Sequence, residues 1–241
     1  MERSGQRKQK RSWVGFCLWR LPGDATRLTV ALGLTLQTLP SAALDPASIA
    51  SNGSADGAPA CGSCHGANGE GNSNAGFPRL SGLAADYLLR QLASFAGAGR
   101  ASEVMQPIAS ALSEPERRAL ASYYAGLPAW KAEGGEPPDG QLVFRGRALA
   151  KSGDWARGMP GCPQCHGPVG QGVGAVFPAL AGQPAAYAAA QLAAWKNKTR
   201  ANDPLGLMAG VAEKLTDDEA AAVSAYYASL PVPATRNGGP R

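Results

Sequence analysis

Apolar residues recur at helical spacing in several separate stretches of this chain. Between residues 83 and 96, Leu88, Leu92 and Phe95 follow one another at i, i+4 and i+7, which places them on one face of a helix. Residues 141–151 predict a second helix. No run of alternating apolar and polar residues is long enough to predict a strand. The pattern therefore predicts an all-α fold of short helices joined by tight loops, which suits the 31 glycines and 19 prolines.

Two later helices begin with the sequence of a capping box. In this motif a Ser or Thr side chain accepts from a first-turn amide, and a Glu three residues later bonds back to the cap. A proline after each helix marks its end. In the first repeat, the corresponding segment is 44–60. Its helical pattern is shorter than that of residues 141–151 and it is richer in small residues, so a helix there is less clear. The capping pairs are Ser113 with Glu116 and Thr216 with Glu219, and the prolines are Pro128 and Pro231.

The chain repeats itself at an offset of about 100 residues. Phe-Pro-Arg-Leu at 77–80 returns as Phe-Pro-Ala-Leu at 177–180, and Tyr-Tyr-Ala-Gly-Leu-Pro at 123–128 returns as Tyr-Tyr-Ala-Ser-Leu-Pro at 226–231. Self-similarity at a fixed period indicates a tandem duplication. We therefore expect a leader over 1–43, a first domain over 44–129, a linker over 130–140, a second domain over 141–235 and a polar tail over 236–241.

The first 43 residues have the three parts of a secretory signal. Basic residues gather at 7–11, an apolar run extends from Leu28 to Leu39, and small residues follow at 41–43. The apolar run is short for a membrane-spanning helix. We expect this leader to be removed on export to the periplasm. The alternative is an uncleaved anchor that attaches the protein to the inner membrane.

The net charge of +5 comes from the leader. It holds seven of the 23 Lys and Arg residues and two of the 18 Asp and Glu residues, so the rest of the chain has 16 of each. A neutral remainder offers no basic surface for a polyanion. We therefore expect no nucleic-acid partner.

Two Cys-x-x-Cys-His motifs stand about a hundred residues apart, one in each repeat. This motif is the attachment signal of a c-type haem. A zinc site would need its cysteine pairs roughly 15–20 residues apart, and a thioredoxin-like redox site would need a βαβ context, so neither reading fits. We predict two covalently bound haem c groups, attached at Cys61, Cys64, Cys162 and Cys165, with His65 and His166 as iron ligands.

The opposite side of each iron needs a second ligand, because both histidines of the chain belong to the motifs. Met105 and Met208 occupy equivalent positions in the two repeats, and we predict that they bind the irons. Met159 has no counterpart and is expected to be a packing residue or a loop residue. The other ring nitrogen of each histidine needs an acceptor, for which the carbonyls of Pro78 and Pro178 are candidates. Ligation by His and Met leaves no free position for a substrate, which suits electron transfer.

Three arginines are candidates for contacts with haem propionates. Arg79 stands where the second repeat has Ala179, and it is either a cation beside the first haem or a solvated surface residue. Arg100 and Arg200 are equivalent residues that precede the two methionines. We expect them to bind a propionate or to anchor the loops that carry the methionines.

These motifs resemble those of the dihaem cytochromes c of the cytochrome c4 family. The resemblance covers nearly everything after the leader. It implies two class I cytochrome c domains related by approximate two-fold symmetry, with His65 and Met105 on one iron and His166 and Met208 on the other. It also implies a carrier, often loosely membrane-associated, that feeds a terminal oxidase from an upstream quinol-oxidising complex. We expect the protein to be a monomer.

The leading functional hypothesis is a periplasmic one-electron carrier that is not itself an enzyme. One alternative is an electron-accepting subunit of a dehydrogenase, with a flavoprotein partner as in the flavocytochrome sulfide dehydrogenases. The other is a catalytic dihaem enzyme, such as a peroxidase or a thiosulfate oxidiser, which would need a vacant or exchangeable axial position.

Overall fold

The computed structural model describes residues 44–131, 134–136 and 138–233. These described residues fall into one compact unit. The predicted leader and polar tail lie outside the described residues. Among the helices that are described, none combines the length and the apolar character needed to cross a membrane.

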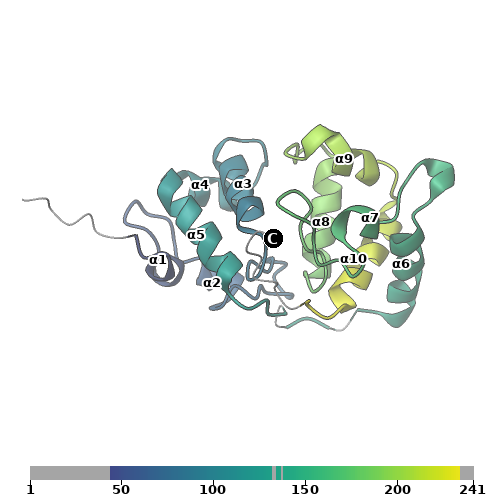
Figure 1. The fold of residues 1–241 in the computed structure, drawn as a ribbon, viewed down its shortest axis with the longest axis horizontal. Coiled ribbons are helices and arrows are strands. Elements are labelled where there is room, and N and C mark those ends of the chain that lie inside the picture. Colours follow the sequence, from purple (N-terminus) through teal and green to yellow (C-terminus); the bar gives the residue numbers. More distant parts are fainter. Residues whose placement is uncertain (1–43, 132–133, 137, 234–241) are drawn as a thin grey trace, which may run out of the picture. The chain divides into compact units, whose positions relative to one another are not determined.

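The described residues form helices and loops, with only isolated β-bridges, so the all-α prediction is confirmed. Figure 1 shows how the helices group within each repeat. The first repeat contains α1 (Pro46–Asn52), α2 (Gly62–His65), α3 (Ala85–Ala96), α4 (Met105–Ser110) and α5 (Glu114–Gly126). The second contains α6 (Gly140–Ser152), α7 (Pro163–His166), α8 (Ala185–Lys196), α9 (Leu207–Ala212) and α10 (Asp217–Ser229), with short 3₁₀ turns at Trp155–Arg157 and Pro204–Gly206.

The first helices of the two repeats differ in length. α1 has 7 residues and is followed by the cap Gly53. Gly53 has a φ of +90°, a backbone conformation that would be strained in a residue with a side chain. α6 has 13 residues and begins at the cap Asp139, whose carboxylate accepts from two first-turn amides. The weak helical pattern of segment 44–60 therefore corresponds to a real but short helix. Both helices pack against the last helix of their own repeat, α1 on α5 and α6 on α10.

The capped helices match the sequence expectation closely. α5 begins after Ser113 and α10 after Thr216, and both capping boxes are complete, with the N3 glutamates Glu116 and Glu219 bonding back to the cap amides. Each of these helices packs on the long helix of its repeat, α5 on α3 and α10 on α8 (Figure 1). Two apolar cores result, one per repeat.

One glycine sets how closely α6 and α10 approach. A Cβ atom at Gly146 would lie 1.9 Å from the carbonyl oxygen of Ala222 on α10. No such contact is possible, so only glycine permits this crossing. The backbones meet here without intervening side chains, and Val223 and Ala150 are buried beside the crossing.

Candidate haem sites

A cavity of about 760 Å³ is continuous through both repeats. This volume lies in the range of cofactor sites, roughly 300–1,000 Å³. Its walls include the two Cys-x-x-Cys-His motifs, the two Phe-Pro segments and the segments that carry the predicted methionine ligands. The predicted site residues that line it are Cys61, Cys64, His65, Pro78, Met105, Cys162, Cys165, His166, Pro178 and Met208.

The motifs lie on single helical turns, and this explains their spacing. In α2, the amides of Cys64 and His65 both donate to the carbonyl of Cys61, at 3.3 and 3.0 Å. Residues i, i+3 and i+4 share one face of a helical turn. The two thiols and the imidazole of each motif therefore face the cavity together, and α7 repeats this arrangement around Cys162.

The cysteines are not poised as redox thiols. All four described cysteines are free rather than paired in disulfides. Burial raises the pKa of the Cys61 and Cys162 thiols, whereas a reactive thiolate requires a lowered pKa. In the described part of the chain, no group of three or more His, Cys, Asp or Glu side chains could hold a metal ion. These observations disfavour the thioredoxin-like and zinc readings of the motifs.

Each buried imidazole is held by a proline carbonyl. His65 Nδ1 lies 2.9 Å from the oxygen of Pro78, and His166 Nδ1 lies 2.8 Å from that of Pro178. A carbonyl can only accept, so Nδ1 carries the hydrogen and Nε2 keeps a free lone pair. Burial lowers the pKa of both histidines, which favours the neutral, metal-binding form.

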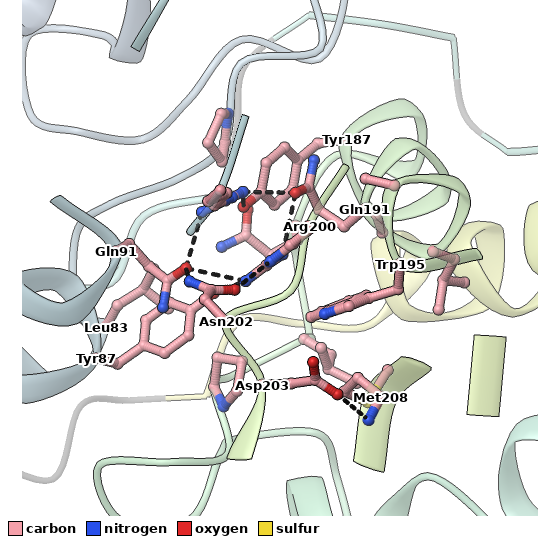
Figure 2. Close-up of a pocket in the computed structure, with 18 of the residues that line it drawn as sticks. Leu83, Tyr87, Gln91, Tyr187, Gln191, Trp195, Arg200, Asn202, Asp203 and Met208 are labelled. Carbon is pink, nitrogen blue, oxygen red and sulfur yellow. Dashed lines mark hydrogen bonds between the residues drawn. The ribbon is translucent and has the colours of Figure 1, made fainter. Parts of the chain in front are cut away.

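The two methionines lie at the starts of equivalent short helices. The Met105 amide donates to Ser102 Oγ at 3.0 Å, and the Met208 amide donates to Asp203 Oδ2 at 2.8 Å, as Figure 2 shows for the second pair. Both methionines line the same cavity as His65 and His166. Met159 is buried in the core of the second repeat, as expected for a packing residue.

One tyrosine of each Tyr-Tyr pair packs on a glycine in the loop that follows the haem motif of its repeat. The Tyr124 ring packs on Gly69 and the Tyr227 ring on Gly170, so closely that a Cβ at either glycine would lie within 2.7 Å of the ring. Both hydroxyls are buried against the first thiol of their motif, Cys61 for Tyr124 and Cys162 for Tyr227, and neither has an oxygen or nitrogen partner in the protein. The buried Nε of Arg79 and the indole nitrogen of Trp195 are also without partners, and all four side chains line the cavity. Orphaned donors of this kind fit a bound group that carries polar oxygens, as haem does through its propionates.

Arg100 and Arg200 are buried and reach across from one repeat to the other. Arg100 donates to Tyr187 Oη at 2.9 Å and to Gln191 Oε1 at 2.5 Å, both on α8. Arg200 donates to Gln91 Oε1 on α3 at 3.0 Å, within the network of Figure 2. These arginines therefore anchor the loops that lead to the methionines, one of the two roles expected for them. Each arginine also bonds to the equivalent glutamine of its own repeat, and no sequence pattern indicates the contacts with the opposite one.

The two loops also pair directly through their backbones. The amide of Ala101 donates to the carbonyl of Thr199 at 2.9 Å, and the amide of Ala201 donates to that of Gly99 at 3.1 Å. The guanidinium of each arginine stacks on an aromatic ring of its own repeat. Arg100 lies 4.4 Å from the ring centre of Phe95, and Arg200 lies 4.0 Å from that of Trp195.

A family model described as cytochrome c matches residues 50–127 and, separately, residues 144–231. The chain belongs to the cytochrome c family. The two matches coincide with the two repeats, so this cytochrome has two tandem domains. It holds two covalently bound haem c groups at its Cys-x-x-Cys-His motifs and is an electron-transfer protein.

Curated relatives cover most of this cytochrome. The chain is 43% identical to the thiosulfate dehydrogenase electron acceptor of Stutzerimonas stutzeri (strain A1501), over 88% of this chain and 94% of that protein. It is 41% identical to cytochrome c4 of Thiocapsa roseopersicina, over 70% of this chain and 86% of that protein. The predicted resemblance to the cytochrome c4 family is confirmed.

Solved structures give the same result for the fold. Reduced recombinant cytochrome c4 from Pseudomonas stutzeri has a TM-score of 0.64 and 33% identity, covering 71% of this chain and 93% of that one. Thiosulfate dehydrogenase (TsdBA) from Marichromatium purpuratum, in its as-isolated form, has a TM-score of 0.73 and 43% identity over 78% of this chain. This chain spans only 40% of the length of that larger protein.

Proposed function

We propose that this dihaem cytochrome is an exported, periplasmic electron carrier that accepts electrons from a thiosulfate dehydrogenase. The proposal rests on one observation. The chain is 43% identical to a relative named thiosulfate dehydrogenase electron acceptor, over 94% of that relative's length. A second acceptor of the same name, from Thiomonas intermedia (strain K12), is 46% identical over 82% of its length. The proposal corresponds to the dehydrogenase alternative of the sequence analysis, with a thiosulfate dehydrogenase in place of the flavoprotein named there, and not to its leading hypothesis of a carrier between a quinol-oxidising complex and a terminal oxidase.

The proposed iron ligands are His65 with Met105 and His166 with Met208. Each haem iron, when bound, cycles between the ferric and ferrous states and carries one electron. The Pro78 carbonyl fixes the imidazole of His65 by accepting from Nδ1, so that Nε2 faces the cavity. The Ser102 hydroxyl accepts from the Met105 amide and holds the start of α4 against the same cavity. Thioether ligation favours the ferrous state and therefore raises the reduction potential.

The arrangement suits electron transfer because little has to move. Both histidines are held by carbonyls of their own repeat, and both methionine loops are tied together across the repeats. A site with fixed ligands changes charge by one unit with little rearrangement. Two such sites in one compact unit let the protein hold two electrons, one at each haem.

A stopped-flow experiment tests the partner. The oxidised holoprotein is mixed with a thiosulfate dehydrogenase and thiosulfate, and reduction of both haems is followed by absorbance. We expect rapid reduction of both haems, and none when the dehydrogenase is left out. A single-haem cytochrome of similar potential serves as the control for unspecific reduction. Equal rates for this cytochrome and the control would refute a specific acceptor role.

The second candidate is a carrier that connects a quinol-oxidising complex to a terminal oxidase. Similarity to cytochromes c4, 39–41% identical over 83–86% of their length for two of them, favours it. Reduction by a quinol-oxidising complex, with none by the dehydrogenase, would select this candidate. Reduction by thiosulfate alone would instead indicate the catalytic alternative.

A further inference from the structure

Arg79 is the least exposed charged side chain in the described structure, at 1%. Its Nη1 donates to the carbonyl of Ser81, and its Nη2 donates to that of Ala181 at 3.2 Å. Its Nε is buried without a partner, and no ion pair of the described residues includes it. The interpretation as a solvated surface residue is therefore wrong.

The two carbonyls that hold this guanidinium are equivalent. Ser81 and Ala181 follow the two Phe-Pro-x-Leu segments at the same position, 100 residues apart. A group bonded to both must lie close to the axis that relates the repeats. The antiparallel bridge between Arg100 and Arg200 marks the same axis by pairing another two equivalent residues. Arg79 therefore lies between the two repeats, in the wall of the cavity that they share.

The chain places one guanidinium where strict symmetry would place two. The equivalent of Arg79 is Ala179, because a second cation at the same point on the axis would repel the first. The hydrogen bonds to the backbone of Arg79 also have no equivalent in the other repeat. Gln183 Oε1 accepts from the Arg79 amide and Gln183 Nε2 donates to the Arg79 carbonyl, both at 3.0 Å, whereas the equivalent of Gln183 is Leu83.

The interior around Arg79 has an excess of positive charge. Arg79, Arg100 and Arg200 are all buried and all line the cavity. Glu116 is the one buried carboxylate among the described residues, and it belongs to the capping box of α5. Burial lowers the pKa of Arg79 to about 10, so the side chain remains protonated at neutral pH. A buried cation requires an anion nearby, and the propionates of the two haems are the anions that this cavity receives.

We propose that Arg79 is a shared cation of the two haem sites, which offsets the propionate charge of both haems and raises both reduction potentials together. A cation opposes the extra positive charge of a ferric iron, so it favours the ferrous form. Its place near the axis makes the two effects similar in size. Arg79 thus sets the common level of the two potentials, and other residues set the difference between them. This role does not depend on which redox partner the protein has.

Redox titration of both haems in the holoprotein tests this role. R79A gives both repeats the same residue, R79K keeps the charge, and R79Q keeps most of the volume if R79A folds poorly. The matched control is R118A, which removes an exposed arginine on α5 that does not line the cavity. Haem content and helical signal are measured for every variant.

We expect R79A and R79Q to shift the ferric–ferrous equilibrium of both haems toward ferric by roughly tenfold each. For one electron, tenfold corresponds to about 59 mV. R79K should leave both reduction potentials close to those of the wild type, and R118A should leave them unchanged. A shift at one haem alone would overturn the shared role, and so would unchanged potentials in R79A or an equal shift in R118A.

Discussion

The crossing of α6 and α10 gives the sharpest prediction about stability. In an exposed helix, replacing glycine by alanine stabilises by about 1 kcal/mol. At Gly146 the new Cβ would lie 1.9 Å from the Ala222 oxygen and 2.9 Å from the Val223 nitrogen. Both are backbone atoms, so no side-chain rotation can relieve the overlap. The helices would have to separate by more than an ångström.

The cost of that separation has two parts. Overpacking a core costs about 1–3 kcal/mol, and a gap of about 1 Å forfeits up to roughly half of each dispersion contact along the crossing. We expect G146A to lower the free energy of unfolding by about 3 kcal/mol. Guanidinium unfolding of the holoprotein, followed by haem absorbance and far-ultraviolet circular dichroism, measures this change.

Gly140, at the start of the same helix, provides the control. A Cβ at Gly140 meets no atom within 4 Å. G140A should therefore be neutral or stabilising by up to about 1 kcal/mol. If G146A proves as stable as G140A, the close approach of the two helices is wrong.

Three further outcomes are expected. M105A and M208A should each remove the methionine-to-iron charge-transfer band at one haem and leave the other haem unchanged. R200A removes four side-chain hydrogen bonds and should lower the free energy of unfolding by about 3 kcal/mol, measured by thermal denaturation. Hydrogen bonding by Arg157 holds the pKa of Glu219 below its ordinary value, so R157A should be less stable than wild type at pH 7. That difference should shrink as the pH falls below about 4.3, the ordinary pKa of glutamate, and through the lowered pKa values of Glu219 and of Asp154, which also pairs with Arg157.

Each of these outcomes has a control. A charge-transfer band that survives both methionine replacements would refute the ligand assignment. R118A removes an exposed i,i+4 ion pair with Glu114 and should cost under about 0.5 kcal/mol, so R200A should be clearly less stable than R118A. A stability difference between R157A and wild type that is equally large at pH 3 and at pH 7 would show that the carboxylates of Glu219 and Asp154 are not its source.

The sequence predicted what local spacing controls. The capping boxes at Ser113 and Thr216 and the two haem motifs were readable because each depends on residues three or four positions apart. The Pro78 carbonyl beside His65 was also predicted, since it recurs in the second repeat.

Contacts between the repeats could not be predicted in the same way. The sequence shows that Arg79 differs from Ala179, but not that the other repeat covers Arg79. Likewise, Gly146 is one of 31 glycines, and only the position of α10 shows why it cannot be another residue. Burial by a distant segment leaves no periodic signal in the residue that is buried.

The reciprocal contacts of Arg100 and Arg200 make the two repeats pair as two subunits would. Each arginine binds the helix of the opposite repeat, through residues that are themselves equivalent. Such reciprocal contacts are those of an isologous homodimer interface. Because both repeats belong to one chain, their pairing is independent of protein concentration. If the interface alone is sufficient, the two halves should stay associated at low micromolar concentration after the holoprotein is cut within residues 130–140.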